Sequence, residues 1–151
     1  MGSGKGCRMK LTKETMDELR KEGYLVTRHG TEFIRYKGLL SLAHNEGLTT
    51  IAIDTIQLPD ESNGNRCIIM ATVSGDKGTY QDIGDASPKD LTGMIVPHLI
   101  RMAATRAKAR ALNNYLGIGI CSVEELGGDT SKPVGRSPEQ QRSEFLDNPQ
   151  V

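Results

Sequence analysis

Apolar and polar residues alternate along the chain with two different periods, one typical of helices and the other typical of strands. Helical spacing covers residues 13–22, behind the capping residue Thr12, and then residues 31–46. Gly23 and Gly47 follow these stretches, where a glycine commonly ends a helix. The pattern therefore predicts two short helices. The first residues of the second stretch also fit an extended segment, so its start stays open.

The middle of the chain has a different pattern, with strict alternation and many β-branched residues, which is typical of strands. Turn-forming residues separate three such runs, and one turn contains the hairpin-forming pair Asn63-Gly64. We therefore expect a three-stranded antiparallel meander. Its strands are predicted at residues 48–58, 66–74 and 79–84.

A long helical pattern follows the predicted meander. Ser87 and Pro88 are a cap and a first-turn residue, so the helix is expected to start there and to run to Leu116. Pro97 interrupts the pattern, which predicts either a kink or two consecutive helices. Glycines after Leu116 end the helix, and residues 122–126 are expected to add a further turn.

The order of these segments predicts an α+β fold. Short helices come first, followed by the three-stranded meander and the long helix packed on it. One domain is expected over residues 11–126. The Gly-rich, basic residues 1–10 and the polar, Pro/Gly-rich residues 127–151 are expected to be disordered.

Composition excludes few functions by itself. The 151 residues include 19 basic and 19 acidic side chains, so net charge indicates neither a nucleic-acid nor a membrane partner. No apolar run reaches the length of a membrane span. The three cysteines, Cys7, Cys67 and Cys121, are too few and too widely spaced for a disulfide framework. A cytoplasmic location is therefore expected.

The distribution of charge is more informative than the total. The long helix contains four cations and no acid within ten residues: Arg101, Arg106, Lys108 and Arg110. On an ideal helical wheel, Arg106 and Arg110 share one flank and Arg101 and Lys108 share the other. Small residues occupy the third side, which suits tight packing. A basic helix face is often only solvated. Here, however, three arginines without neighbouring glutamates make an anionic partner about as well supported as a solvated face.

No enzyme site is apparent. The glycines near the N-terminus lack the spacing of a phosphate-binding loop, and the three histidines and three cysteines lack the spacing of metal ligands. We therefore expect no cofactor, no metal and no catalysis. The acids Asp82 and Asp85, on either side of Gly84, leave a metal-dependent nuclease as a weak alternative.

Several sequence motifs resemble those of the Rad-fifty-two-type single-strand annealing superfamily, above all its bacterial DdrA-like branch, which acts in the DNA damage response. The similarity covers roughly residues 33–126. It is most specific in the long helix and extends to the Gly-Ile-Gly-Ile-Cys and Glu-Glu-Leu motifs that follow. The motifs are Tyr36-Lys37-Gly38-Leu39-Leu40 with Ala43-His44, Gly78-Thr79-Tyr80-Gln81-Asp82-Ile83-Gly84-Asp85-Ala86, and Arg101-Met102-Ala103 continued by Thr105-Arg106-Ala107-Lys108-Ala109-Arg110-Ala111-Leu112.

The resemblance implies a β-β-β-α core, assembled side by side into a ring, with single-stranded DNA in a basic groove outside it. It also implies that Arg110 binds phosphate. Ala109 and Asn113 stand where the eukaryotic branch has Lys and Arg. These departures predict a weaker or rearranged groove unless neighbouring cations compensate.

The expected function is therefore ATP-independent binding and annealing of single-stranded DNA in recombination and repair, by a homo-oligomeric ring. Sequence-independent cations suffice for this task because they hold phosphates and leave bases free to pair. The alternative is a protein-interaction or scaffold module whose basic helix contacts an acidic partner. The expected DNA-binding residues are Arg110, Lys108, Arg106, Arg101, Lys37, Arg35 and Arg66.

Overall fold

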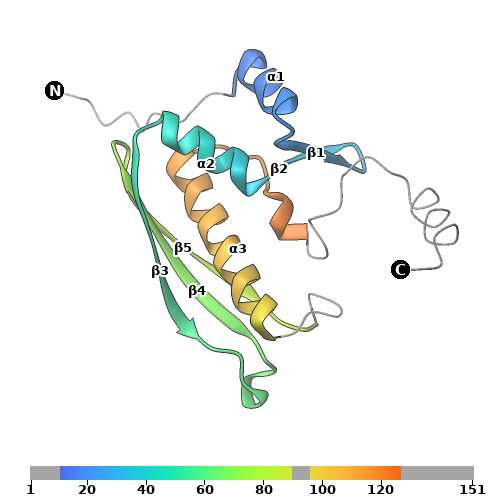
Figure 1. The fold of residues 1–151 in the computed structure, drawn as a ribbon, viewed down its shortest axis with the longest axis vertical. Coiled ribbons are helices and arrows are strands. Elements are labelled where there is room, and N and C mark those ends of the chain that lie inside the picture. Colours follow the sequence, from blue (N-terminus) through green and yellow to red (C-terminus); the bar gives the residue numbers. More distant parts are fainter. Residues whose placement is uncertain (1–10, 90–95, 127–151) are drawn as a thin grey trace, which may run out of the picture.

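A computed structural model of the chain describes residues 11–89 and 96–126, drawn in colour in Figure 1. The segments predicted to be disordered, 1–10 and 127–151, lie outside the described residues. The class is α+β, as predicted. In chain order, the elements are α1 (Lys13–Lys21), β1 (Leu25–Arg28), β2 (Thr31–Ile34), α2 (Tyr36–Asn45), β3 (Leu48–Gln57), the 3-10 helix η1 (Glu61–Asn63), β4 (Cys67–Gly75), β5 (Gly78–Ala86), α3 (Val96–Leu116) and the 3-10 helix η2 (Val123–Leu126).

The first helix forms where the sequence predicts it. The Thr12 side chain accepts a hydrogen bond from the backbone N–H of Thr15, which caps the N-terminus of α1. Gly23 has a φ of +76° just after the helix, a conformation that glycine adopts without strain. The turn between α1 and the next element is therefore determined by local sequence.

The predicted helix over residues 31–46 is wrong in its first five residues. Thr31–Ile34 is instead strand β2, paired antiparallel with β1, and α2 begins only at Tyr36. The turn between the strands places His29 and Gly30 at positive φ, 51° and 77°. Such a pair forms a tight hairpin turn, but histidine is a weak sequence signal for it. The extended alternative left open for this segment describes it correctly.

The three-stranded antiparallel meander is confirmed, with strand order β3-β4-β5. In its register, Ile69 of β4 lies opposite Thr55 of β3 and Gly84 of β5. The odd-numbered residues of β4 from Cys67 to Val73 are buried, whereas the even-numbered ones are only partly buried. One face of the sheet therefore carries the core.

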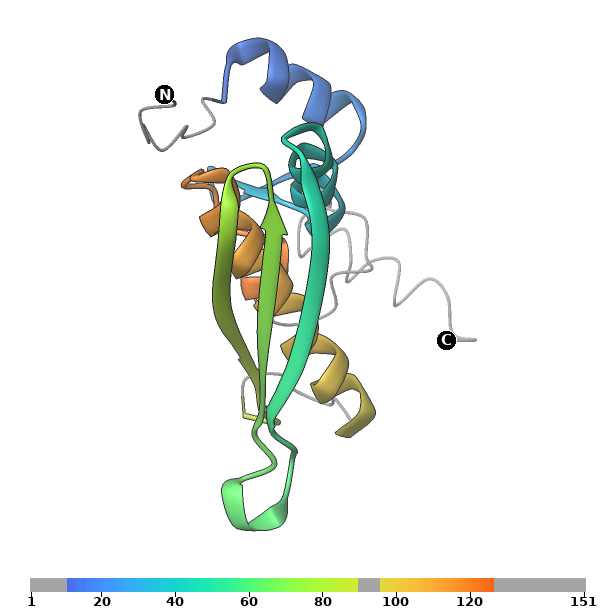
Figure 2. The ribbon, with the colours of Figure 1, turned by 90° about the vertical axis from the view of Figure 1, so that its left-hand side faces the viewer.

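The long helix α3 packs across that core face, mainly on β4 and β5. Its small residues permit a close approach: a Cβ atom on Gly84 would overlap the backbone of Ala103 and Ala107. In Figure 2 the sheet lies in front of α3, and no element among the described residues covers its outer face. Helix α2 packs on α3, and both belong to a single hydrophobic core.

The predicted start of the long helix is wrong. Pro88 and Lys89 form a turn, and residues 90–95 lie outside the described part of the chain. Pro97 is the second residue of α3, so it neither kinks the described helix nor divides it. A proline is tolerated there because the first helical N–H groups have no partner within the helix. No helix among the described residues is long and apolar enough to cross a membrane.

Candidate nucleic-acid interface

The structure divides the predicted DNA-binding cations into two sets on opposite flanks of α3. Arg106 and Arg110 reach over the free edge of β5, where Arg66 joins them. We call these three residues the edge set. Lys108 lies instead over Tyr36 of α2, on the flank that it shares with Arg101. We call Arg101, Lys108 and Lys37 the open set; Lys37 is the residue after Tyr36.

Arg106 is almost completely buried, with 6 % of its surface exposed. Its Nε donates to the carbonyl oxygen of Glu124 at 2.9 Å, and its Nη1 donates to that of Asp85 at 2.8 Å. One guanidinium therefore joins β5 to η2. A phosphate outside the protein has little access to this group.

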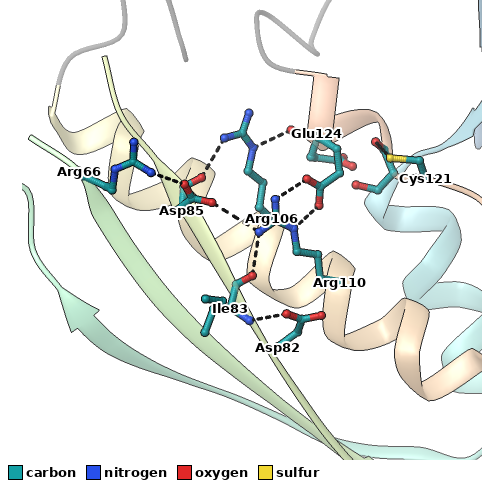
Figure 3. A network of polar contacts seen from close by, with 10 residues as sticks. Arg66, Asp82, Ile83, Asp85, Arg106, Arg110, Cys121 and Glu124 are labelled. Carbon is teal, nitrogen blue, oxygen red and sulfur yellow. Dashed lines mark hydrogen bonds and ion pairs between the residues drawn. The ribbon is translucent and has the colours of Figure 1, made fainter. Parts of the chain in front are cut away.

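Arg110, one turn further along α3, makes a similar connection (Figure 3). Its Nε and Nη2 donate to the two carboxylate oxygens of Glu125, each at 2.7 Å. Its Nη1 donates to the carbonyl oxygen of Ile83 at 2.9 Å. The hydrogen bonds that Arg110 donates to Glu125 are the main cause that raises the pKa of Arg110, with a contribution from the charge of Asp85. A bidentate carboxylate occupies the fork that a phosphate would otherwise use.

Acids compensate two cations of the edge set, Arg66 and Arg110. Arg66 pairs with Asp85 at 2.9 Å, and Arg110 approaches the other oxygen of the same carboxylate at 3.5 Å. Figure 3 shows the three arginines around the end of β5. These contacts satisfy the carbonyl groups of an edge strand and hold η2 against α3. Their evident role is structural.

The open set differs because its charges are uncompensated. Lys37 and Arg101 are exposed, and Lys108 is partly buried. None of the three forms an ion pair with another residue in the described ranges 11–89 and 96–126. The ammonium of Lys108 lies 5.0 Å from the centre of the Tyr36 ring. The ring orients this cation without neutralising it.

Arg35, the remaining predicted cation, precedes α2 as its N-cap residue. Its backbone N–H donates to the carbonyl of Tyr24, which joins α2 to the hairpin. The carboxylate of Glu124 accepts from the backbone N–H of Tyr36 at 3.1 Å, at the positive end of α2. Burial first, and then the charge of Glu124, raises the pKa of Tyr36. Arg35, Lys37 and Lys108 therefore lie at the N-terminus of α2, and Arg101 lies two turns before Lys108 on α3.

Tyr36 and Tyr80, two aromatic side chains of a kind that can stack on bases, have different surroundings. Tyr80 packs edge-to-face on Tyr115, with ring centres 5.9 Å apart, beside the core. Tyr36 is also partly buried against the core. Both rings therefore pack within the protein.

The two acids of the nuclease alternative are not brought together. Asp82 lies opposite Ala71 on the core side of the sheet, and Asp85 lies opposite Ile68 on the other side. Asp82 accepts a hydrogen bond from the Asn114 side chain, whereas Asp85 pairs with arginines. Among the described residues, no group of three or more histidines, cysteines, aspartates or glutamates is arranged to hold a metal ion.

The sequence does not predict the contacts of Glu124 and Glu125 with the edge set, which are a backbone carbonyl in Glu124 and a carboxylate in Glu125. Glu124 and Glu125 were noted only as part of a family motif, and nothing in their spacing places them against α3. The available signal was their position just after the long helix, on a segment short enough to fold back.

Comparison with known proteins gives no match to the chain, whether with protein families, curated proteins or solved structures.

Proposed function

We propose that the chain binds single-stranded DNA and anneals complementary strands without ATP, as a homo-oligomeric ring, in recombination and repair. The proposal rests on the resemblance described above and on its β-β-β-α core, for which β3, β4, β5 and α3 are the corresponding elements. The resemblance alone, however, does not say which cations are available to DNA.

The observation that carries the proposal is the open set. Arg101 and Lys108 are seven residues apart on α3, which is about 10 Å along the helix axis. Lys37 follows Tyr36, whose ring Lys108 covers, and no acid among the described residues pairs with any of the three cations. A row of uncompensated cations binds a phosphate backbone without reading sequence. We therefore assign the DNA contacts to these residues and a structural role to the edge set.

A single subunit with three such cations binds weakly. Each phosphate contact on a single strand changes the salt dependence of binding by a slope of about −0.7, so one subunit gives about −2. A ring joins many such sites along one strand, and this multivalency supplies the affinity that one site lacks. Annealing then requires only that bases stay free to pair.

The test is binding of a labelled single strand of mixed sequence, followed by fluorescence anisotropy over a range of salt concentrations. The variant carries Lys37→Ala, Arg101→Ala and Lys108→Ala. We expect affinity to fall by at least tenfold and the salt slope to fall by about two per subunit bound.

The matched control removes three other exposed lysines, by Lys13→Ala, Lys21→Ala and Lys89→Ala. It is expected to keep at least a third of the wild-type affinity, because only the total charge changes. Equal losses in the two variants would contradict the site assignment. A wild-type protein that binds acidic polypeptides but no single strand would favour the scaffold alternative instead.

A further inference from the structure

The edge strand β3 and the residue after it expose an unusual amount of apolar surface. Ile53, Ile56 and Leu58 are 49 %, 57 % and 60 % exposed, and only one other large hydrophobic among the described residues is comparably exposed. Three such side chains within six residues form a cluster on a small domain. Clustered apolar surface of this kind typically marks an interface.

The two edges of the sheet are chemically different. At the β5 edge, Arg106 and Arg110 donate to the carbonyl groups of Asp85 and Ile83, which blocks a further strand there. Strand β3 pairs only with β4 among the described strands. Free N–H and C=O groups along an unguarded edge are a ready template for another chain.

The same edge is acidic. Residues 48–65, which comprise β3, η1 and the residues between and after them, contain Asp54, Asp60 and Glu61 but no Lys, Arg or His. Hydrogen bonds from Ser62 lower the pKa of Asp60, which keeps this acid ionised. Because acidic and basic residues are equal in number over the whole chain, the rest of the chain carries a surplus of positive charge.

We propose that residues 48–65, the β3–η1 edge, are the surface by which each subunit docks on a second copy of the chain, head to tail. Two such edges facing each other would bring like charges together, whereas other surfaces of a second copy offer the opposite charge. A head-to-tail contact leaves one free β3–η1 edge after each addition, so it produces a ring or a filament. This inference rests on the homo-oligomer of the proposed function and specifies its interface.

The test is the mass of the protein in solution, measured by light scattering without DNA. The variant carries Ile53→Lys and Ile56→Lys, at half-exposed positions where lysine is tolerated in the folded subunit; circular dichroism checks the fold. We expect a monomer in place of the wild-type oligomer. The control Glu14→Lys adds the same two units of charge on α1 and is expected to keep the wild-type mass. A double variant of unchanged mass, or a monomeric wild type, overturns the inference.

A mixing experiment tests the head-to-tail arrangement. The double variant keeps its accepting surface, so it can still occupy the β3–η1 edge of a wild-type subunit and stop further growth. Wild-type and excess variant chains, mixed in urea and refolded together, should therefore form smaller species than wild-type chains alone. Wild-type oligomers of undiminished mass would show that the edges pair with each other and overturn this arrangement.

These readouts separate the inference from the proposed function. Mass is measured without DNA, and binding is measured on the wild-type protein. Binding and annealing by a wild type whose mass does not depend on β3 would overturn the interface alone. Oligomers that depend on β3 but do not bind single strands would overturn the DNA-binding function alone.

Discussion

The structural role of Arg106 leads to a quantitative prediction for Arg106→Ala. The side chain is 6 % exposed and donates to two carbonyl groups, on Glu124 and Asp85. A hydrogen bond from a charged donor contributes about 1.5–3 kcal/mol net. We use the lower figure because burial of the guanidinium itself costs free energy. The loss of both bonds then lowers the free energy of unfolding by about 3 kcal/mol.

The effect is large relative to the stability of a small domain, about 5–15 kcal/mol. At about 3–4 °C per kcal/mol for a chain of this size, Arg106→Ala should melt about 10 °C below wild type. The assay is thermal and urea denaturation followed by circular dichroism, at one fixed protein concentration because oligomers make stability concentration-dependent.

Arg101→Ala is the matched control, because it removes an exposed arginine from the same helix. Its free energy of unfolding should change by no more than about 0.5 kcal/mol. If Arg106→Ala were as stable as Arg101→Ala, and weakened DNA binding more, the division into an edge set and an open set would be wrong.

Further predictions concern packing, pH and thiol chemistry. Gly84→Ala should destabilise the fold by about 3 kcal/mol in urea denaturation, because its Cβ would overlap the backbone of α3; wild-type stability would contradict this packing. Burial raises the pKa of Cys67, so the folded state holds this proton more tightly than the unfolded state. Stability should therefore fall as pH rises above the pKa of a free thiol, about 8.5. The fall should be shallower in Cys67→Ala, and a fall as steep as in wild type would refute this cause. Peptide mapping after iodoacetamide treatment of the folded protein should find Cys121 modified and Cys67 protected, since Cys121 is exposed and Cys67 is buried; equal labelling would contradict the burial.

Local patterns predicted much of the fold. Thr12 and Gly23 determine the ends of α1, and strand alternation located the meander to within two residues at each strand end. These features depend on neighbours in sequence, so sequence shows them directly. The hairpin of β1 and β2 was missed because His29 at positive φ has little sequence signature. The helix start at Ser87 was misplaced because a capping pattern involves only a few neighbouring residues. Such a pattern does not by itself show that a helix starts there.

The candidate site was predictable in composition but not in arrangement. The wheel separated Arg106 and Arg110 from Arg101 and Lys108, and the structure keeps that separation. Which flank meets carboxylates depends on how η2 folds back on α3, a tertiary contact that no local spacing encodes. For that reason Arg110, to which the resemblance assigns phosphate binding, is paired with a carboxylate within the protein.

The most direct test of the central claim is an annealing assay with two complementary labelled strands, without ATP or metal. Wild-type protein and the control variant Lys13→Ala, Lys21→Ala, Lys89→Ala should accelerate duplex formation, whereas Lys37→Ala, Arg101→Ala, Lys108→Ala should do so far less. We expect this order of rates at moderate salt. Wild-type protein that leaves the spontaneous rate unchanged, at concentrations where it is oligomeric, would contradict it.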